Sequence, residues 1–169
     1  MQTVGEMTTI PVLLSMGHRL CSSLLTEARL ALVDADWLVV NECLHEATVR
    51  LESQMQAEEA VLLPRLAGVS PEADAPLVQC RNEHQAIRAR MHAAAEAAAR
   101  HDKVRCAQTL SRLFDLFYAH SMAEERRIYA LTHDMDDAVL ETLAHALSKP
   151  ADQTPTPPAS GAAASRRPH

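Results

Sequence analysis

Apolar side chains recur along most of the chain at alternating intervals of four and three residues, the spacing that places them on one face of an α-helix. The first seam of this kind consists of Leu14, His18, Cys21, Leu25, Ala28 and Leu32. Comparable seams occupy residues 37–63, 76–100 and 103–131, and a shorter one covers residues 138–147. Because such faces are buried by packing helices together, the pattern predicts an all-α fold, an up-down-up-down four-helix bundle with a short C-terminal fifth helix.

Residues typical of helix ends separate these seams. The Asp-Ala-Asp triplet at residues 34–36 divides the first helix from the second, and Pro64 begins a longer connection to the third helix. The helical pattern is missing at both ends of the chain, and the C-terminal end is rich in Pro, Ala and Ser. We therefore expect a flexible lead-in at residues 1–9, the bundle over residues 10–148 and a disordered tail over residues 149–169.

Polar side chains interrupt the seams at matching places in the two halves of the chain. When the chain is aligned with itself so that His18 falls on His84, Glu58 falls on Glu124. The same alignment places Gln54 on His120, so the two halves differ at this position. The chain therefore contains an internal repeat whose matching positions are polar residues on otherwise apolar faces.

The spacing within each half places these polar residues at one height in the bundle. Asp36 and Asp102 mark the two hairpin turns. His18 and Gln54 are equally far along the chain from the first turn, and His84 and His120 are equally far, by the same interval, from the second. At about 1.5 Å rise per residue, each pair would lie ~27 Å from its turn. Four helices are thus expected to bring their polar side chains to a common level.

The residue types at this level are those of a metal site. A histidine and a glutamate four residues apart, such as His120 and Glu124, lie one turn apart on one helix face and can reach a common ion. A mixed set of imidazole nitrogens and carboxylate oxygens suits iron, manganese or zinc better than calcium or magnesium. Two carboxylates from different helices, Glu58 and Glu124, favour two ions that share a site. The candidate metal ligands are His18, Glu58, His84, His120 and Glu124, with Gln54 as a further ligand or a supporting group.

The chain contains four cysteines and no CxxC motif, which is typical of buried, reduced thiols that pack as small apolar groups. Cys21 and Cys80 lie in the seams about one turn from His18 and His84, on opposite sides of the polar level. Either thiol could serve as a substitute ligand or as a redox-active group near a metal, and plain packing is the alternative.

Composition and charge narrow the range of partners. The 169 residues carry a formal net charge of −6 without a basic stripe, which argues against binding to nucleic acid or to anionic membranes. No apolar run approaches the ~18–20 residues of a membrane span. The N-terminal residues do not have the pattern of a secretion signal. We expect a cytoplasmic protein that is a monomer or a homodimer.

The arrangement of these residues resembles the hemerythrin-like, or HHE cation-binding, domain family. The pattern of that family is a histidine on the first helix, His-x-x-x-Glu on the second, a histidine on the third and His-x-x-x-Glu on the fourth. The two Ala-Glu-Glu segments at residues 57–59 and 123–125 are similar to the two Glu-Glu segments of the family. The resemblance covers residues 10–147.

This resemblance implies a non-haem di-iron centre that binds oxygen, nitric oxide or a peroxide, or that handles iron. It also implies a role for each ligand: terminal for His18, His84 and His120, and bridging for Glu58 and Glu124.

Two residues depart from the family pattern. Gln54 stands where the family has a histidine, and an amide oxygen is a weaker ligand than imidazole for a late divalent ion. One metal position is therefore expected to bind more loosely, to be open to water or a ligand, or to be empty. Arg88 stands one turn after His84, where the oxygen carriers of the family have a second histidine, and this speaks against reversible oxygen carriage.

Three functions remain open from the sequence. The leading hypothesis is a hemerythrin-like metal-binding protein that meets a small diatomic or peroxide ligand as a sensor, as a store or in stress defence. The second is an oxidoreductase of catalase or peroxidase type, which needs an open coordination position. The third is a metal-free bundle that acts in protein–protein interaction, with its histidines as satisfied core residues.

Overall fold

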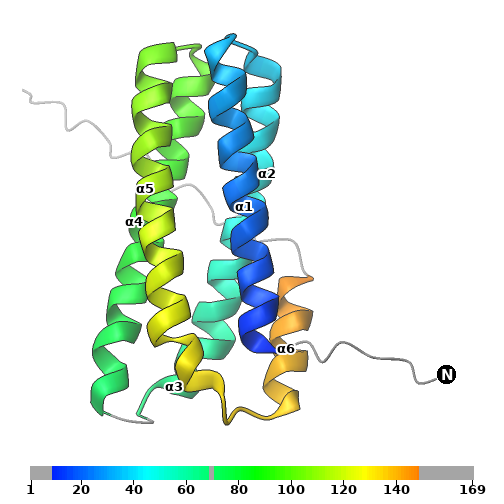
Figure 1. The fold of residues 1–169 in the computed structure, drawn as a ribbon, viewed down its shortest axis with the longest axis vertical. Coiled ribbons are helices and arrows are strands. Elements are labelled where there is room, and N and C mark those ends of the chain that lie inside the picture. The colour runs from blue at the N-terminus through cyan, green and yellow to red at the C-terminus, as the bar shows by residue number, and fades with distance from the viewer. Residues whose placement is uncertain (1–8, 69–70, 149–169) are drawn as a thin grey trace, which may run out of the picture.

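The computed structural model of the chain describes residues 9–68 and 71–148 (Figure 1). Its elements, in order, are α1 (Ile10–Val33), α2 (Trp37–Ala57), the π-helical segment η1 (Glu58–Leu62), α3 (Leu63–Leu66), α4 (Pro71–Ala99), α5 (Lys103–Arg127), the 3₁₀-helical segment η2 (Tyr129–Thr132) and α6 (Asp137–Leu147). The four long helices run up and down along one axis, and the described residues form no strand, so the predicted all-α bundle is confirmed. The predicted disordered tail and nearly all of the predicted lead-in lie outside the described residues.

The two hairpin turns have the same construction. Ala35 and His101 adopt positive φ angles of 56° and 52°. Each is followed by an aspartate, Asp36 or Asp102, whose Oδ1 accepts a hydrogen bond from the backbone amide three residues further on, at 3.3 and 3.0 Å respectively. Such capping fixes where the next helix begins. The internal repeat therefore extends to the backbone, because both turns start their second helix at equivalent positions.

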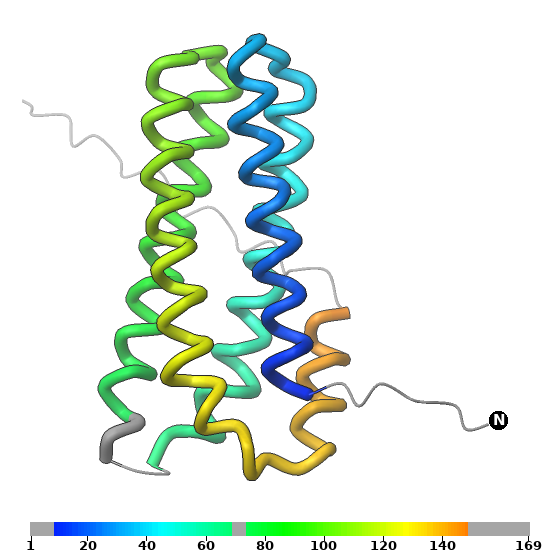
Figure 2. The backbone as a smooth tube through the Cα atoms, viewed as in Figure 1, coloured from blue at the N-terminus to red at the C-terminus, as the bar shows by residue number. Residues whose placement is uncertain are grey.

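Two apolar clusters fill the bundle, one on each side of the predicted polar level. The cluster nearer the hairpin turns, here called the turn-side cluster, includes Leu25, Leu44, Ile87, Leu110 and Phe117. The cluster at the other end includes Leu14, Leu62, Leu66, Ile128 and Leu143. Figure 2 shows both hairpin turns at one end of the bundle and α6 beside the other end, where α6 packs against α2, η1 and α1. Within residues 9–68 and 71–148, every helix is too short or too polar to span a lipid bilayer.

Two helix boundaries differ from those that the sequence pattern predicts. The third helix begins at Pro71 rather than near Pro76, because a proline at the first helical position has no amide that needs a partner. Pro76 costs the helix one hydrogen bond without ending it. The second helix changes at Glu58 into a π-helical turn, in which the Leu63 amide donates to the Glu58 carbonyl five residues earlier. Such turns are frequent at functional sites, and this one begins at a predicted metal ligand.

Candidate metal centre

Six polar side chains are buried at one level between the two apolar clusters. They are His18 of α1, Gln54 of α2, Glu58 of η1, His84 of α4, and His120 and Glu124 of α5. None of the six is more than 5% exposed. Among the described residues, Thr132 is the only other buried polar residue. The structure thus places all five predicted ligands, together with Gln54, in one buried layer.

Glu124 lies at the middle of this group. Its Oε2 is 3.3 Å from His18 Nε2 and 3.5 Å from His120 Nε2. Its Oε1 is 3.7 Å from His84 Nε2. Glu58 approaches the same imidazole, with its Oε2 3.3 Å from His84 Nε2. All three imidazoles therefore present Nε2 to carboxylate oxygens, which is the arrangement needed to share a cation.

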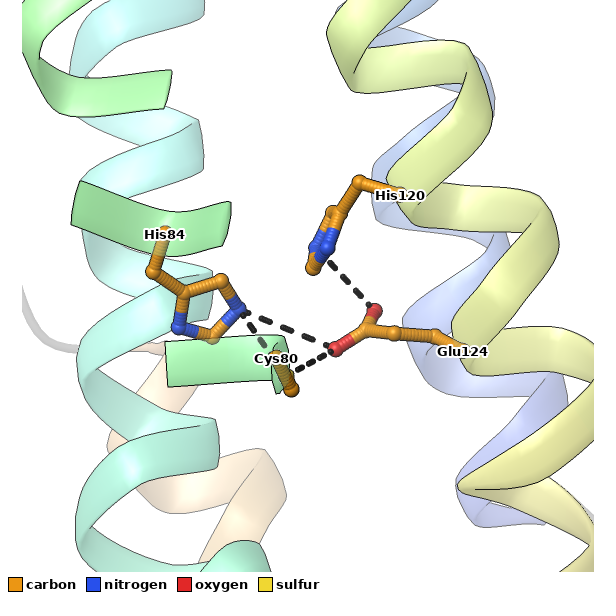
Figure 3. Close-up of side chains that lie close together, drawn as sticks. All are labelled: Cys80, His84, His120 and Glu124. Carbon is orange, nitrogen blue, oxygen red and sulfur yellow. Dashed lines mark hydrogen bonds and ion pairs between the residues drawn. The ribbon is translucent and has the colours of Figure 1, made fainter. Parts of the chain in front are cut away.

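Two overlapping groups of side chains have candidate donor atoms within 4.8 Å of one another. The first group consists of Cys80, His84, His120 and Glu124, which point into a common space from α4 and α5 (Figure 3). The second group consists of His18, Glu58 and Glu124. Metal–ligand bonds of about 2.0–2.3 Å place donor atoms roughly 3–4.5 Å apart, so the donors of both groups lie at or close to the spacing of a ligand set. Glu124 belongs to both groups and could bridge two ions.

Two oxygens in this layer, Glu58 Oε2 and Glu124 Oε2, are buried and accept no hydrogen bond. Each has an imidazole Nε2 at 3.3 Å as an ion-pair partner but lacks a well-formed hydrogen bond, and a bound cation would serve a buried carboxylate oxygen better. Both oxygens lie beside imidazole nitrogens and not against apolar side chains. The residues of this layer therefore fit a buried metal ion.

Burial and neighbouring charges separate the protonation of the two glutamates. Burial, reinforced by the charge of Glu124, raises the pKa of Glu58. Burial acts in the same direction on Glu124, but the His18 and His84 imidazoles outweigh it and lower the pKa of that carboxyl. Burial opposes protonation of the His18 and His84 imidazoles. Nevertheless, Glu124 raises the pKa of His18. The pKa of His84 is raised by Cys80, Glu124 and Glu58. In the metal-free protein the excess negative charge is therefore balanced by protons.

Two of the imidazoles are held from behind by carboxylates. His84 Nδ1 lies 2.7 Å from Glu59 Oε1, and His120 Nδ1 lies 2.9 Å from Glu83 Oε2. A proton on Nδ1 leaves Nε2 free to bind a metal, and such partners fix the orientation of the ring. Each glutamate adjoins a predicted ligand in sequence but supports an imidazole on a different helix. The sequence therefore indicates that they are near the site without indicating which ring they contact.

Arg88 binds Glu59, one of these supporting carboxylates, together with Glu52, and does not contact the centre itself. Its Nη1 lies 3.0 Å from Glu59 Oε1, and its Nε lies 2.8 Å from Glu52 Oε2. Burial opposes ionisation of Glu59, but Arg88 and His84 lower the pKa of this carboxyl. Arg88 therefore keeps Glu59 charged and in place behind His84.

His18 has a different kind of support. Its Nδ1 lies 3.4 Å from the hydroxyl oxygen of Tyr129, and the two rings are nearly parallel, with centroids 6.3 Å apart. Burial raises the pKa of Tyr129, so its hydroxyl stays protonated. The repeat gives no signal for this contact, because the position equivalent to Tyr129 is Leu63, which has no polar atom in its side chain.

Gln54 reaches the centre through its amide nitrogen. Nε2 donates to Glu58 Oε1 at 2.9 Å and to the Leu14 carbonyl at 3.4 Å. Oε1 rests against Gly17, where a Cβ atom would overlap it. The nitrogen is a donor and not a metal ligand, so in this conformation Gln54 supports Glu58. Gln54 thus presents no ligand atom to this layer at the position where the family pattern has a histidine.

The two cysteines singled out by the sequence lie in different surroundings. Cys80 Sγ is 3.0 Å from Glu124 Oε1 and 3.5 Å from His84 Nε2. Cys21 is buried in the turn-side cluster, and in the described part of the chain it belongs to neither group of candidate donors. The structure therefore brings Cys80 to the centre and places Cys21 among apolar side chains.

Comparison with known proteins gives one match. A family model described as the hemerythrin HHE cation binding domain matches residues 10–132. This span carries every polar side chain of the buried layer. No curated protein and no solved structure gives a significant match.

Proposed function

The chain belongs to the family of hemerythrin HHE cation-binding domains, and from this premise we propose that its buried centre holds two non-haem iron ions. One ion is assigned to His84, His120 and Glu124, and the other to His18, Glu58 and Glu124. The observation that carries this proposal is the pair of buried carboxylate oxygens that accept no hydrogen bond and lie beside imidazole Nε2 atoms. Manganese and zinc accept the same ligand types, and metal analysis distinguishes them from iron.

The function that we propose for this centre is to bind or sense a small ligand, namely oxygen, nitric oxide or a peroxide. Iron would supply an exchangeable coordination position and a change of oxidation state. The position beside His18 is the better candidate for the ligand, because Gln54 offers Glu58 a hydrogen bond and leaves one ligand place unfilled. The buried donors exclude bulk water, and Tyr129 lies beside His18 with a hydroxyl that stays protonated because burial raises its pKa. A sensor, a store and a stress-defence protein all need such a shielded position.

Reversible oxygen carriage is not part of this proposal. The oxygen carriers of the family have a second histidine one turn after the one equivalent to His84, and this chain has Arg88 there. Its guanidinium is bound to Glu52 and Glu59 and does not reach the centre as a ligand.

A peroxide-consuming oxidoreductase of catalase or peroxidase type is the second candidate. The conformation of Gln54 favours it, because a reaction with peroxide also needs an open coordination position. A metal-free bundle that only contacts other proteins has less support, since it leaves Glu58 Oε2 and Glu124 Oε2 buried without hydrogen bonds.

Metal analysis of the purified protein tests the proposal. We expect iron to bind preferentially when iron, manganese and zinc are offered together to the metal-free protein. The oxidised protein should show the absorption bands of a bridged ferric pair, and nitric oxide or hydrogen peroxide should change them. Release of oxygen from added peroxide would identify the catalase-type function. A protein that stays free of metal after anaerobic loading with each of the three ions would refute the metal centre.

A further inference from the structure

We propose that Cys80 is a metal ligand in its thiolate form, so that one metal position has sulfur, nitrogen and oxygen donors and the other has only nitrogen and oxygen. This inference rests on the proposed metal centre and adds to it a ligand that the family pattern does not contain. It assigns the Cys80 position to ions that accept soft ligands, such as zinc and iron.

The geometry around the thiol is that of a ligand set. Cys80 and His84 lie one turn apart on α4, His120 and Glu124 lie one turn apart on α5, and all four side chains point toward one another (Figure 3). The sulfur is 3.0 Å from Glu124 Oε1 and 3.5 Å from His84 Nε2. In a tetrahedral site with bonds of about 2.0–2.3 Å, neighbouring donor atoms are roughly 3.5 Å apart. The sulfur therefore lies at ligand-like distances from two of the other three donors.

A second observation at the same place points to a ligand. Glu124 is 2% exposed, and its Oε2 is buried without a hydrogen bond beside two imidazole nitrogens. The Cys80 thiol can satisfy only Oε1 of this carboxylate. A cation held between sulfur, imidazoles and carboxylate would serve both oxygens.

Cys80 differs in this respect from the other three cysteines. All four thiols are free and buried. Cys21, Cys43 and Cys106 belong to the turn-side cluster, away from the candidate donors. The repeat places Leu14 at the position equivalent to Cys80, so a thiol is available to only one of the two metal positions.

The binding step conserves charge and protons without any further reagent. The S–H bond of Cys80 breaks and a sulfur–metal bond forms, and the proton that occupies His84 Nε2 in the metal-free protein gives way to a nitrogen–metal bond. Both protons leave to solvent. Glu124 Oε1, which accepts a hydrogen bond from the thiol in the metal-free protein, then becomes available to the ion. The additional negative charge also offsets the charge of a metal ion in the buried layer.

Cobalt(II) substitution tests this proposal, because thiolate coordination gives cobalt an intense near-ultraviolet charge-transfer band that nitrogen and oxygen ligands do not give. Cobalt is titrated into metal-free wild type, Cys80→Ala, Cys80→Ser and the matched control Cys21→Ala, and bound cobalt is measured separately by equilibrium dialysis. Cys21 is a suitable control because it is equally buried and lies one turn from His18. We expect the band in wild type and in Cys21→Ala, and its loss in both Cys80 variants. Affinity at that position should fall at least about tenfold in the Cys80 variants.

Each outcome bears on a distinct claim. If wild type binds cobalt without the band, or if the band survives in Cys80→Ala, the thiolate assignment is wrong and the metal centre stands. If wild type binds no cobalt, zinc or iron, the metal centre itself fails and the thiolate assignment fails with it. X-ray absorption of zinc-loaded wild type needs no variant and therefore does not depend on how the variants fold. It should show a sulfur neighbour at about 2.3 Å, and its absence would overturn the proposal.

Discussion

The two helical hairpins, α1 with α2 and α4 with α5, follow one sequence repeat but contribute unequally to the buried centre. The second hairpin supplies four candidate donors, namely Cys80, His84, His120 and Glu124. The first, with the η1 segment that continues it, supplies His18 and Glu58, and its Gln54 presents an amide nitrogen. A repeated backbone thus sets the height of the site, and the side chains on it decide how many ligands each half provides.

The two hairpins differ both at a candidate ligand and at the residue that supports it. In the second hairpin His120 is supported by Glu83. The repeat aligns Gln54 with His120 and Gly17 with Glu83. In the first hairpin, therefore, the imidazole and its supporting carboxylate are both replaced, and the smaller pair fits because Gln54 Oε1 occupies the space above Gly17. The absence of a histidine at position 54 therefore has to be considered together with the small residue at position 17.

The imidazoles that match in the repeat, His18 and His84, are also supported differently. Behind His84 stand Glu59 and then Arg88, whereas behind His18 stands the neutral Tyr129. Charged partners raise the basicity of a ligating histidine more than a phenol does. If the proposed metal centre is correct, the comparison predicts a tight metal position in the second hairpin and a weaker, ligand-accepting one in the first.

The largest effect should come from removing the carboxylate that both positions share. We predict that Glu124→Ala strips both metal ions and lowers the free energy of unfolding by about 3–5 kcal/mol, because it leaves buried imidazoles without their partner. Glu58→Ala should leave the position of the second hairpin filled. Metal content by mass spectrometry and chemical denaturation of both variants measure this difference. Equal metal loss in the two variants would remove the distinction between the hairpins.

Exchanging the residue that distinguishes the hairpins should change metal binding in opposite directions. We predict that Gln54→His tightens binding at the position beside His18, since imidazole is a stronger ligand than an amide. The reciprocal change, His120→Gln, should weaken binding in the second hairpin and lower thermal stability. Metal-to-protein ratios after dialysis against a weak chelator report both effects. An unaltered ratio in Gln54→His would show that position 54 does not reach the metal.

The fold and the level of the site could be predicted from the sequence because both depend on spacing. Helical periodicity indicates which faces are buried, and the positions of Asp36 and Asp102 fix the register of each hairpin. The repeat then indicates which residues share a level. The π-helical turn at Glu58 could not be predicted in this way, because it depends on packing around that residue and not on any local signal.

The contacts within the centre were less predictable, because they depend on side-chain rotamers and on pairs from different helices. Cys21 and Cys80 each lie about one turn from a predicted histidine ligand in the sequence, yet only Cys80 points toward a carboxylate of the centre. For Gln54 the sequence left two roles open, a ligand or a supporting group, and the structure has its oxygen against Gly17 and its nitrogen donating to Glu58. Periodicity indicates which face a residue lies on but does not determine which atom points inward.

A smaller effect is expected from the carboxylate behind His120. We predict that Glu83→Ala weakens metal binding by about 10–100-fold through loss of ring orientation, with Glu83→Gln intermediate because its amide oxygen still accepts from Nδ1. Glu96→Ala is a control on the same helix, since this exposed carboxylate pairs with Arg100 at the surface. Competitive titration against a chromophoric chelator measures the affinities. If Glu83→Ala and Glu96→Ala behaved alike, the carboxylate would have no role behind the ring.

The smallest effect, and the most specific test of how the first hairpin is shaped, concerns Gly17. Alanine in place of a glycine inside a helix stabilises it by about 1 kcal/mol. At this position, however, the new Cβ would displace Gln54 Oε1 and disturb the two hydrogen bonds from Nε2, worth about 1 kcal/mol each. We predict that Gly17→Ala slightly lowers the free energy of unfolding in wild type.

The effect of Gly17→Ala on the free energy of unfolding should change sign when the Gln54 amide is absent. In a Gln54→Ala background nothing opposes the helix gain, so Gly17→Ala should raise the free energy of unfolding by about 1 kcal/mol. The coupling between the two positions is read from denaturation of the two single variants and the double variant, all in the metal-free state. Additive effects would mean that Gln54 does not depend on the missing side chain at position 17. The first hairpin would then lack a ligand only because of the residue at position 54, and not because of the space around it.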